Sequence, residues 1–458
     1  MGFRRQCHRF EALAGREGRI TSPTMSDNRP IRVPSSRLAR LARLGSVASG
    51  IAGTAAVEGA RRWSRGDRPE LRDLILTPDN TERLTRELAR MRGAAMKVGQ
   101  LLSMDAGDLV PPELQAILAR LRADADHMPP RQLRSVLDKA WGEGWLSHFK
   151  HFDPRPMAAA SIGQVHRAVT KDGRDLAIKV QYPGVRGSID SDVANVGALV
   201  RLSGLLPKGV DLNPMLEEAR RQLRDEADYE REARELGRYA GFVAGWPSLC
   251  MPEVHADLST RDVLTMSYVS GGPVEDLADH PDRDEVAARI VALLVAEIFE
   301  FGASQTDPNF ANYRYDPEAD CLVLLDFGAV RDLPETLITE AQALLRRGLA
   351  DDREGAAQVL ARVGAWGVDT APHHRAIILD MVMTVFDAIR EDRPVDFGDP
   401  ALRRRLHDLG MGLGADGTFI HVPPIDALFL QRKIAGTYLL LNRLGASVNV
   451  RAALEPYL

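Results

Sequence analysis

Apolar residues recur at steps of three and four after Thr77-Pro78. This period predicts one face of an α-helix with a proline near its first turn. Proline pairs at 111–112 and 129–130 interrupt the pattern, and a shorter helix is expected after each pair, the second running through Trp141. The apolar positions of the first helix are Leu84, Leu88, Met91, Ala95, Val98 and Leu102.

The pattern then becomes that of strands. Segments 162–169 and 176–182 are predicted to pair through a turn at Lys171-Asp172-Gly173, and 262–269 to form another strand. Short strands are also expected around 322–325. These strands between helical segments indicate a mixed α+β fold.

Further helices are expected over 192–206 and over the strongly charged segment 213–240. The nearly continuous apolar run 291–301 predicts a buried helix. Beyond about residue 333 the chain shows helical periodicity and no obvious chemistry. The C-terminal part is therefore expected to be largely helical.

The length of 458 residues allows two or three domains and a large core. The hydrophobic content of 45% and charged content of 27% are typical of a soluble globular protein. A net charge of −5 gives no reason to expect nucleic-acid binding. Three cysteines without paired spacing predict that a disulfide framework is absent and that the compartment is reducing.

The N-terminal region is basic, because residues 1–72 contain many arginines and no lysine. It could contact anionic lipid or a partner, or be a solvated tail. Segment 44–60 is built from small residues, with an alanine at every fourth position from Ala48 to Ala60. It is short and contains Glu58, so a weakly membrane-associated helix and an ordinary packing helix both remain open. The start of the natural chain could be Met1 or Met25.

The richest chemistry lies where Asp307 and Asn312 precede Asp326-Phe327-Gly328. In kinase-type sites an aspartate orients the attacking group, while an asparagine and the Asp-Phe-Gly aspartate hold Mg²⁺ on the nucleotide phosphates. Mg²⁺ prefers such oxygen ligands. This spacing predicts a phosphoryl-transfer site.

Such a site needs a cation for the phosphates, and Lys179 lies in a predicted strand between apolar neighbours. A buried lysine needs a partner, although an edge lysine that reaches solvent is the alternative. The acidic run 225–233 offers Asp228 and Glu232 on one helix face, with Glu226 half a turn away. Alone, this run would read as a solvated helix surface.

Ahead of Lys179, an alanine-rich loop stands where a kinase has its glycine-rich loop. Alanine allows close backbone approach to phosphate but less conformational freedom than glycine. Upstream, Lys97 and Gln100 project from the same side of a helix. The loop consists of Ala158, Ala159, Ala160, Ser161, Ile162, Gly163 and Gln164.

Together these motifs resemble the UbiB/AarF (ADCK) family of atypical kinases, over about residues 80–335 and in the family's order. The catalytic loop from Gln305 to Asn309 is similar to that of the coenzyme Q biosynthesis branch. The resemblance implies a two-lobed protein-kinase-like α+β fold with a helical extension over the active site. It also implies ATP or ADP with Mg²⁺, a slow, lipid-responsive ATPase, association with membranes and support of ubiquinone biosynthesis.

The resemblance divides the chain into four parts. A basic arm spans 1–75 and includes the candidate membrane-associated helix, and a family-specific helical extension with the Lys-x-Gly-Gln motif spans 76–147. The N-lobe spans 148–270 and the helical C-lobe 271–458.

The resemblance also gives catalytic and metal-binding roles by position. Lys179 is the phosphate-binding lysine, Glu232 is its helix partner and Asp307 is the catalytic aspartate. Asn312 and Asp326 are the Mg²⁺ ligands.

Further residues would line the nucleotide pocket in a member of this family. Lys97 and Gln100 reach into the space where a protein substrate would otherwise lie. Glu226 and Asp228 form a Glu-x-Asp motif that is expected to meet Lys97.

The alanine-rich loop would cover the phosphates and alter nucleotide preference. Segment 265–269, which includes Met266 and Tyr268, would line the adenine through backbone groups. Thr306 occupies the place of the arginine in His-Arg-Asp, so control by a phosphorylated activation loop is not expected.

The leading hypothesis is therefore an ATP-hydrolysing atypical kinase, cytoplasmic and peripheral at the inner face of a membrane, or on the matrix side in a mitochondrion. Its expected partners are membrane lipids or quinone precursors and coenzyme Q biosynthesis proteins, with a homodimer left open. The alternatives are phosphotransfer to a protein or small molecule, and a nucleotide-gated lipid-binding scaffold.

Overall fold

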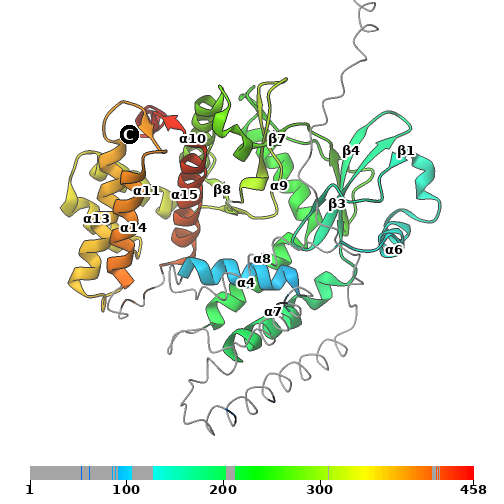
Figure 1. Ribbon diagram of the computed structural model, residues 1–458, viewed down its shortest axis with the longest axis horizontal. Coiled ribbons are helices and arrows are strands. Elements are labelled where there is room, and N and C mark those ends of the chain that lie inside the picture. The colour runs from blue at the N-terminus through cyan, green and yellow to red at the C-terminus, as the bar shows by residue number, and fades with distance from the viewer. Residues whose placement is uncertain are drawn as a thin grey trace, which may run out of the picture.

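The computed structural model describes residues 91–105, 127–202, 212–307, 309–414, 419, 421 and 423–458, together with residues 53, 61, 85 and 88. Within these residues, strands and a few helices form one lobe, and a largely helical second lobe lies beside it (Figure 1). The fold is α+β, as the hydrophobic pattern predicted.

The sheet of the first lobe has the strand order β1-β3-β4-β6, with every pair antiparallel. Strands β3 and β4 are joined by a turn in which Gly173 has a φ of +94°, a conformation that favours glycine. The predicted strands are confirmed to within a few residues. The strand bounds are β1 (Phe149–Phe152), β2 (Ala158–Ala159), β3 (Gly163–Thr170), β4 (Asp175–Gln181) and β6 (Val263–Ser267).

One face of this sheet packs against α6 (Pro130–Trp141), the helix expected after the second proline pair, and the short η2 (Trp145–His148). The buried residues there include Leu137, Trp145 and Ile178. On the other face, α9 (Tyr229–Phe242) packs against β6.

The charged segment 213–240 is not one helix, as its sequence suggested, but two. Helix α8 (Asn213–Glu226) ends at Ala227, and α9 begins after Asp228. The Asp228 side chain accepts a hydrogen bond from the backbone N–H of Arg231, which is an N-cap and starts a new helix. The helix expected over 192–206 starts earlier, as α7 (Val185–Leu202).

Helix α4 (Arg92–Asp105) lies across α7 and α8 (Figure 1). Leu88, Met91, Ala95 and Val98 are buried in this cluster, which confirms these positions of the predicted apolar face. The adjacent helices contribute residues such as Val193 and Leu216. Leu84 lies outside the described residues, as does the Leu102 side chain.

The second lobe is built around α10 (Arg283–Phe299), whose C-terminal half is the predicted buried run. Short β-strands before and after α10 frame the loops that carry the Asp and Asn motifs. Their bounds are β5 (Leu249–Cys250), β7 (Gly272–Pro273), β8 (Ala303–Gln305), β9 (Tyr313–Asp316), β10 (Cys321–Leu324) and β11 (Val330–Asp332), with the 3₁₀ turns η3 (Val274–Asp279) and η4 (Phe310–Asn312).

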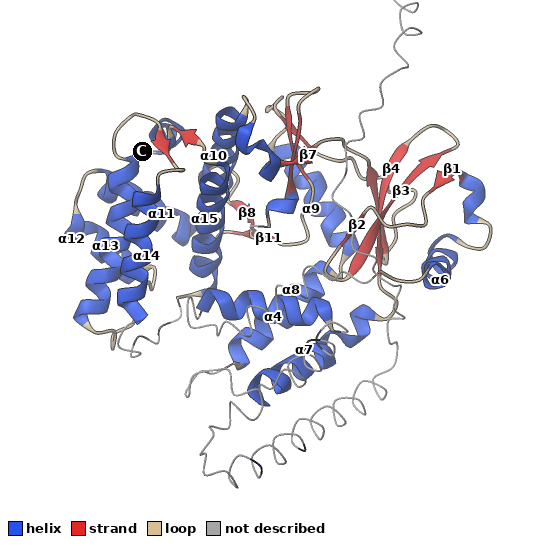
Figure 2. Cartoon of the chain, in the orientation of Figure 1, coloured by secondary structure: helices blue, strands red, loops and turns tan. Residues whose placement is uncertain are grey.

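The rest of this lobe is helical, as expected, apart from one short strand pair. Helices α11 to α14 pack together at the end of the molecule away from the β1–β6 sheet (Figure 2), and α15 packs against α10. The bounds are α11 (Glu335–Leu349), α12 (Arg353–Arg362), α13 (Pro372–Ile389), α14 (Pro400–Gly414), α15 (Ile425–Leu444), α16 (Val450–Leu454), η5 (Glu455–Tyr457), β12 (Val395–Asp396) and β13 (Ser447–Val448).

Two cysteines are joined, so the expectation of no disulfide is wrong. Cys250 and Cys321 form a disulfide with their Cα atoms 5.8 Å apart. Strands β5 and β10 pair in parallel and bring together residues 71 positions apart in the sequence. The cysteine content therefore gives no support to a reducing compartment.

No helix among the described residues has the length and apolarity needed to span a bilayer. The segment 44–60 lies outside those residues apart from Gly53, and so does nearly all of the 1–75 arm. The membrane-associated helix stays a prediction.

Candidate active site

Lys179 on β4 and Glu232 on α9 form a buried ion pair. The Lys179 ammonium donates to both carboxylate oxygens of Glu232, at 2.7 and 2.8 Å. Asp326 also approaches the ammonium, with an oxygen 3.7 Å from Nζ. The structure thus brings together three residues from distant parts of the sequence, and the edge-lysine reading of Lys179 does not hold because its side chain is only 10% exposed.

Burial by itself would lower the pKa of Lys179, but Asp326 and Glu232 outweigh it and raise that pKa, so the ammonium stays charged. Burial raises the pKa of Glu232 to about 7, against the opposing effect of Lys179. Two carboxylates compete for one ammonium, and Glu232 is the one that is easier to protonate.

Asp326 is held by its own Asp-Phe-Gly turn. Its Oδ1 accepts a hydrogen bond of 2.9 Å from the Gly328 N–H. Burial would raise its pKa, but Lys179 and that N–H lower it, so the carboxylate is ionised. Phe327 is buried against Tyr239 of α9, with ring centroids 4.8 Å apart. Arg231, also on α9, donates to the Gly328 and Val330 carbonyls at 3.0 and 2.7 Å.

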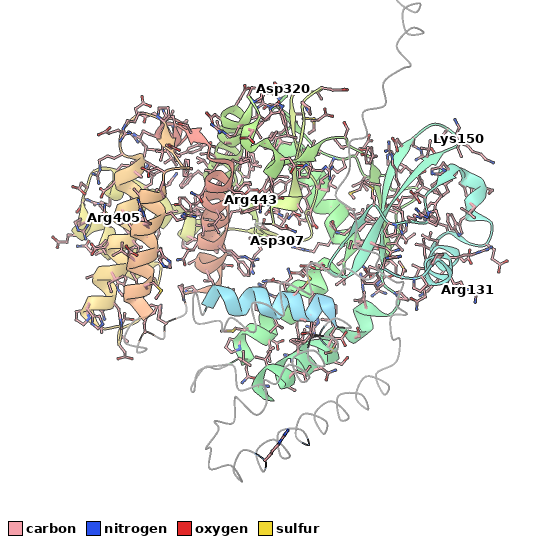
Figure 3. All side chains as sticks on the ribbon, in the orientation of Figure 1. Arg131, Lys150, Asp307, Asp320, Arg405 and Arg443 are labelled. Atoms are coloured by element: carbon pink, nitrogen blue, oxygen red, sulfur yellow. A yellow bond between two sulfur atoms is a disulfide. The ribbon has the colours of Figure 1, made fainter. Side chains whose placement is uncertain are left out.

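The loop with Asp307 and Asn312 is tied to the same turn. The Asn312 carbonyl accepts a 3.1 Å hydrogen bond from the Leu325 N–H, which brings Asn312 next to Asp326. The Asn312 side-chain nitrogen donates to the Asp307 carbonyl at 3.3 Å. Thr306, at the place of the usual arginine, donates from its hydroxyl to the Ala329 carbonyl at 2.8 Å. Figure 3 shows Asp307 near the middle of the molecule.

The donor set fits Mg²⁺. Asn312 uses its nitrogen as a hydrogen-bond donor, so its carbonyl oxygen is the atom suited to a metal, and Asp326 adds an ionised carboxylate. No group of three or more His, Cys, Asp or Glu side chains suited to a metal ion occurs in the described parts of the chain. Such a site suits an ion whose other ligands are phosphate oxygens and water, as Mg²⁺ in kinases is.

Lys97 reaches this site from α4. Its ammonium forms an ion pair with Glu226 at the end of α8, and it is only 5% exposed. Glu226 also accepts a 2.5 Å hydrogen bond from the Ser161 hydroxyl, so the helical extension and the alanine-rich loop meet at one carboxylate. Asp228, which was expected to meet Lys97 as well, instead caps α9 by accepting a 3.0 Å hydrogen bond from the Arg231 N–H. Gln100 lies on α4, but its side chain is outside the described residues.

The alanine-rich loop forms an exposed edge. Ala158 and Ala159 are exposed and pair with β3 as β2, and the half-buried Ala160 follows before the turn. Ile162 is buried beneath the loop. A Cβ at Gly163 would lie 2.4 Å from the Val180 carbonyl oxygen, so glycine is required by this close approach.

Gln164 turns away from the loop toward the segment before α6. Its side-chain oxygen accepts a 2.8 Å hydrogen bond from the Met128 N–H, and its nitrogen lies 2.8 Å from the His166 ring. Its side chain is fully buried, so a direct contact with nucleotide is not supported by this arrangement.

At the end of β6, the backbone N–H of Tyr268 donates to the Asp175 carbonyl at 2.8 Å. The ring of Tyr268 stacks under the Arg167 guanidinium, 3.9 Å away. Met266, paired with Ala177 of β4, is buried. The N–H of Tyr268 is therefore engaged within the lobe, and the role of segment 265–269 beside an adenine stays a prediction.

Two cations that the sequence reasoning missed come from α15. A terminal guanidinium nitrogen of Arg432 lies 3.6 Å from an oxygen of Asp307. Lys433 is buried beneath the same loop and donates to the Gln305 carbonyl at 2.9 Å. The available signal was the adjacent pair Arg432-Lys433 in segment 425–444, whose other residues are mostly apolar. Burial raises the pKa of Asp307, while Lys97 and Arg432 oppose that rise.

These features define a kinase-like phosphoryl-transfer enzyme with the Lys–Glu pair and the Asp-Phe-Gly turn assembled. The model of the ABC1 atypical kinase-like domain matches residues 120–360, and the chain belongs to this family, the UbiB/AarF atypical kinases. The chain is therefore an atypical kinase-like enzyme.

Several named relatives are similar over most of the chain. The atypical kinase COQ8, mitochondrial, of Saccharomyces cerevisiae is 37% identical over 91% of this chain and 84% of its own length. The atypical kinase COQ8B, mitochondrial, of Danio rerio is 36% identical over 92% of this chain and 68% of its own. The chain spans only 58% of the Caenorhabditis elegans relative, atypical kinase coq-8.

Among solved structures, the complex of Rv3197 with erythromycin from Mycobacterium tuberculosis has the same fold. Its TM-score is 0.57, with 24% identity, over 82% of this chain and 95% of that one. The kinase-like two-lobed fold is thereby confirmed.

Proposed function

We propose that this chain binds Mg-ATP and Mg-ADP and hydrolyses ATP slowly in the site around Lys179, and that it supports ubiquinone biosynthesis at a membrane. The observation that carries the proposal is the contact of Lys179 with Glu232 at 2.7 Å and with Asp326 at 3.7 Å. This is the arrangement in which kinases hold a phosphate-binding lysine next to a metal-binding aspartate.

Each residue of the site would have a separate role in nucleotide binding or hydrolysis. Lys179 would bind phosphate oxygens, with Glu232 holding its ammonium in place. Asn312 and Asp326 would hold Mg²⁺, which would neutralise charge on the phosphates when bound. Asp307 would orient the attacking water and take its proton. Its burial raises its pKa and makes it a stronger base than an exposed aspartate.

The position of Lys97 favours the proposal that ATP is hydrolysed rather than used to phosphorylate a protein. Its ammonium lies in the active-site region, paired with Glu226 and close enough to influence the pKa of Asp307. The α4 helix that carries it therefore covers the side where a polypeptide acceptor would dock. Water or a small molecule remains an acceptor of suitable size.

The link to ubiquinone rests on the relatives. Those named above are called mitochondrial COQ8 kinases, and the match covers most of this chain. We propose a peripheral position for this chain on the inner face of a membrane, the matrix side in a mitochondrion. Lipids, quinone precursors and coenzyme Q biosynthesis proteins are the proposed partners, and a homodimer stays a prediction.

The test is hydrolysis of ATP by purified protein, with and without anionic liposomes and a phenolic quinone precursor. Asp326→Asn removes the ionised Mg²⁺ ligand and is expected to lower the rate by about 100-fold or more. Labelled γ-phosphate distinguishes hydrolysis from transfer, which would label the phenol or a protein. An undiminished rate in Asp326→Asn, or tight ATP binding without turnover under any condition, would overturn the proposal.

A further inference from the structure

A second buried ion pair lies directly behind the catalytic loop. Lys433 of α15 is 2% exposed, Glu297 of α10 is 1% exposed, and the ammonium nitrogen is 2.9 Å from a carboxylate oxygen. The ammonium also donates to the Gln305 carbonyl at 2.9 Å and to the Tyr313 hydroxyl at 3.0 Å. An ammonium has three donors, and all three are used here.

The Glu297 carboxylate also has several hydrogen-bond donors around it. Glu297 accepts a 2.9 Å hydrogen bond from the Ser304 hydroxyl and a 3.4 Å one from the Tyr239 hydroxyl. The Gln305 N–H also points to it at 3.5 Å. Tyr239 belongs to α9, so the network extends from α15 to the helix that also carries Glu232.

The positions of these contacts bracket the proposed catalytic residues. Gln305 is two residues before Asp307, and Tyr313 is the residue after Asn312. The Gln305 side chain donates in turn to the Asp326 carbonyl at 3.3 Å. One buried ammonium thus holds both ends of the catalytic loop and, through one side chain, the Asp-Phe-Gly turn.

Stability alone is a poor reason for such a pair. Removing two charges from water is costly, and replacing a buried ion pair by apolar groups of similar volume is often neutral or stabilising. What an apolar replacement lacks is direction, because only a donor with fixed geometry can set the position of the Gln305 carbonyl and the Tyr313 hydroxyl.

We propose that the Lys433–Glu297 pair is a positioning device that sets the distances among Asp307, Asn312 and Asp326. The inference rests on the proposed Mg-nucleotide site and adds two residues that never touch substrate or metal. They act through Gln305 and Tyr313 on the loop between them. Their removal should therefore affect the use of Mg²⁺ and the chemical step, and leave the rest of nucleotide binding in place.

The informative variant is the double substitution Lys433→Met/Glu297→Gln, which removes both charges and keeps the volumes. Lys433→Met alone would leave a buried unpaired carboxylate and could fail to fold. The matched control is Arg443→Met/Glu275→Gln, which removes a 2.9 Å ion pair between the same α15 helix and η3, with the Arg443 side chain exposed.

Three quantities are measured for each full-length protein: kcat for ATP hydrolysis, ADP affinity with and without Mg²⁺, and the thermal unfolding midpoint. In the double variant we expect kcat to fall by about tenfold or more, and the tightening of ADP binding by Mg²⁺ to be largely lost. Affinity for ADP without Mg²⁺ should stay within about twofold of the parent, with a similar unfolding midpoint. The control should match the parent in every quantity.

The inference is overturned if the folded double variant keeps the parent's kcat and Mg²⁺ dependence. It is equally overturned if kcat, metal-free ADP affinity and the unfolding midpoint fall together, because that pattern reports a general loss of structure. If the parent does not hydrolyse ATP, the proposed activity fails, and the Mg²⁺ dependence of ADP binding still decides the role of the pair. A parent that binds no nucleotide overturns both.

Discussion

At the scale of single residues, the site is governed by cations placed beside carboxylates. Lys179 lies between Glu232 and Asp326, Lys97 pairs with Glu226, and Arg432 approaches Asp307. A nearby cation offsets the cost of burying a carboxylate, so Lys179 lowers the pKa of Asp326 and Arg432 opposes the rise in the pKa of Asp307. The pH dependence of activity is therefore a direct readout of these contacts.

We predict that Arg432→Met moves the acid limb of the pH–kcat/KM profile to higher pH. Burial already raises the pKa of Asp307, and the Arg432 guanidinium opposes that rise. Without the cation the pKa of Asp307 rises further. Asp307 must be deprotonated to act as a base, so activity disappears at a higher pH as the solution is acidified. Profiles measured from acid to neutral pH check this shift.

Arg443→Met is the control for that experiment, because Arg443 is an exposed cation on the same helix that pairs with Glu275. Its acid limb should coincide with that of the parent. Coincidence of the Arg432→Met limb with the parent limb would instead mean that Asp307 does not titrate in the observed step.

At the scale of elements, the break between α8 and α9 is the feature that arranges the site. Helix α8 ends with Glu226, which pairs with Lys97, and α9 starts three residues later at Tyr229 and carries Glu232, which pairs with Lys179. In a continuous helix, Glu226 and Glu232 would project from one straight helix axis, whereas here each belongs to a different helix. The cap at Asp228 produces the change of direction, because its side chain satisfies an N–H at the start of α9.

We predict that Asp228→Ala destabilises the protein by about 0.5–2 kcal/mol and also lowers kcat by about tenfold, because the first turn of α9 carries Glu232. Asp352→Ala is the matched control: Asp352 caps α12 in the same way, with its side chain accepting from the Gly355 N–H. It should lose similar stability with unchanged kcat. Denaturant unfolding and steady-state hydrolysis measure the two effects, and equal kinetic losses in both variants would contradict the assignment.

At the scale of the whole molecule, the sequence predicts the parts of the site that are local and misses those that depend on folding. Asp326-Phe327-Gly328 and the strand with Lys179 carry their own spacing, so their chemistry is readable from a few neighbours. Arg432 and Lys433 have no such motif, since a cation in an apolar helix reveals its role only when α15 packs on the catalytic loop. The disulfide is hidden for the same reason.

That disulfide connects a strand of the chain before residue 270 to one after it, and it lies just upstream of the Asp-Phe-Gly turn. Cys321 is in β10, which leads to Asp326, and Cys250 is in β5, which precedes β6. It closes a loop of 71 residues. In the chain-entropy model, a crosslink of this length stabilises the folded state by roughly 4 kcal/mol, because it restricts the unfolded chain.

We therefore predict that reduction with dithiothreitol lowers the free energy of unfolding by about 2–4 kcal/mol. Chemical denaturation of oxidised and reduced protein measures the difference. The Cys250→Ala/Cys321→Ala variant should unfold like the reduced parent and be insensitive to the reductant, whereas Cys7→Ala should keep the full response. If reduction leaves the unfolding midpoint of the parent unchanged, the crosslink does not hold these two strands together in solution. The β5–β10 contact would then depend on backbone pairing and on the buried residues around Leu249 and Leu322 alone.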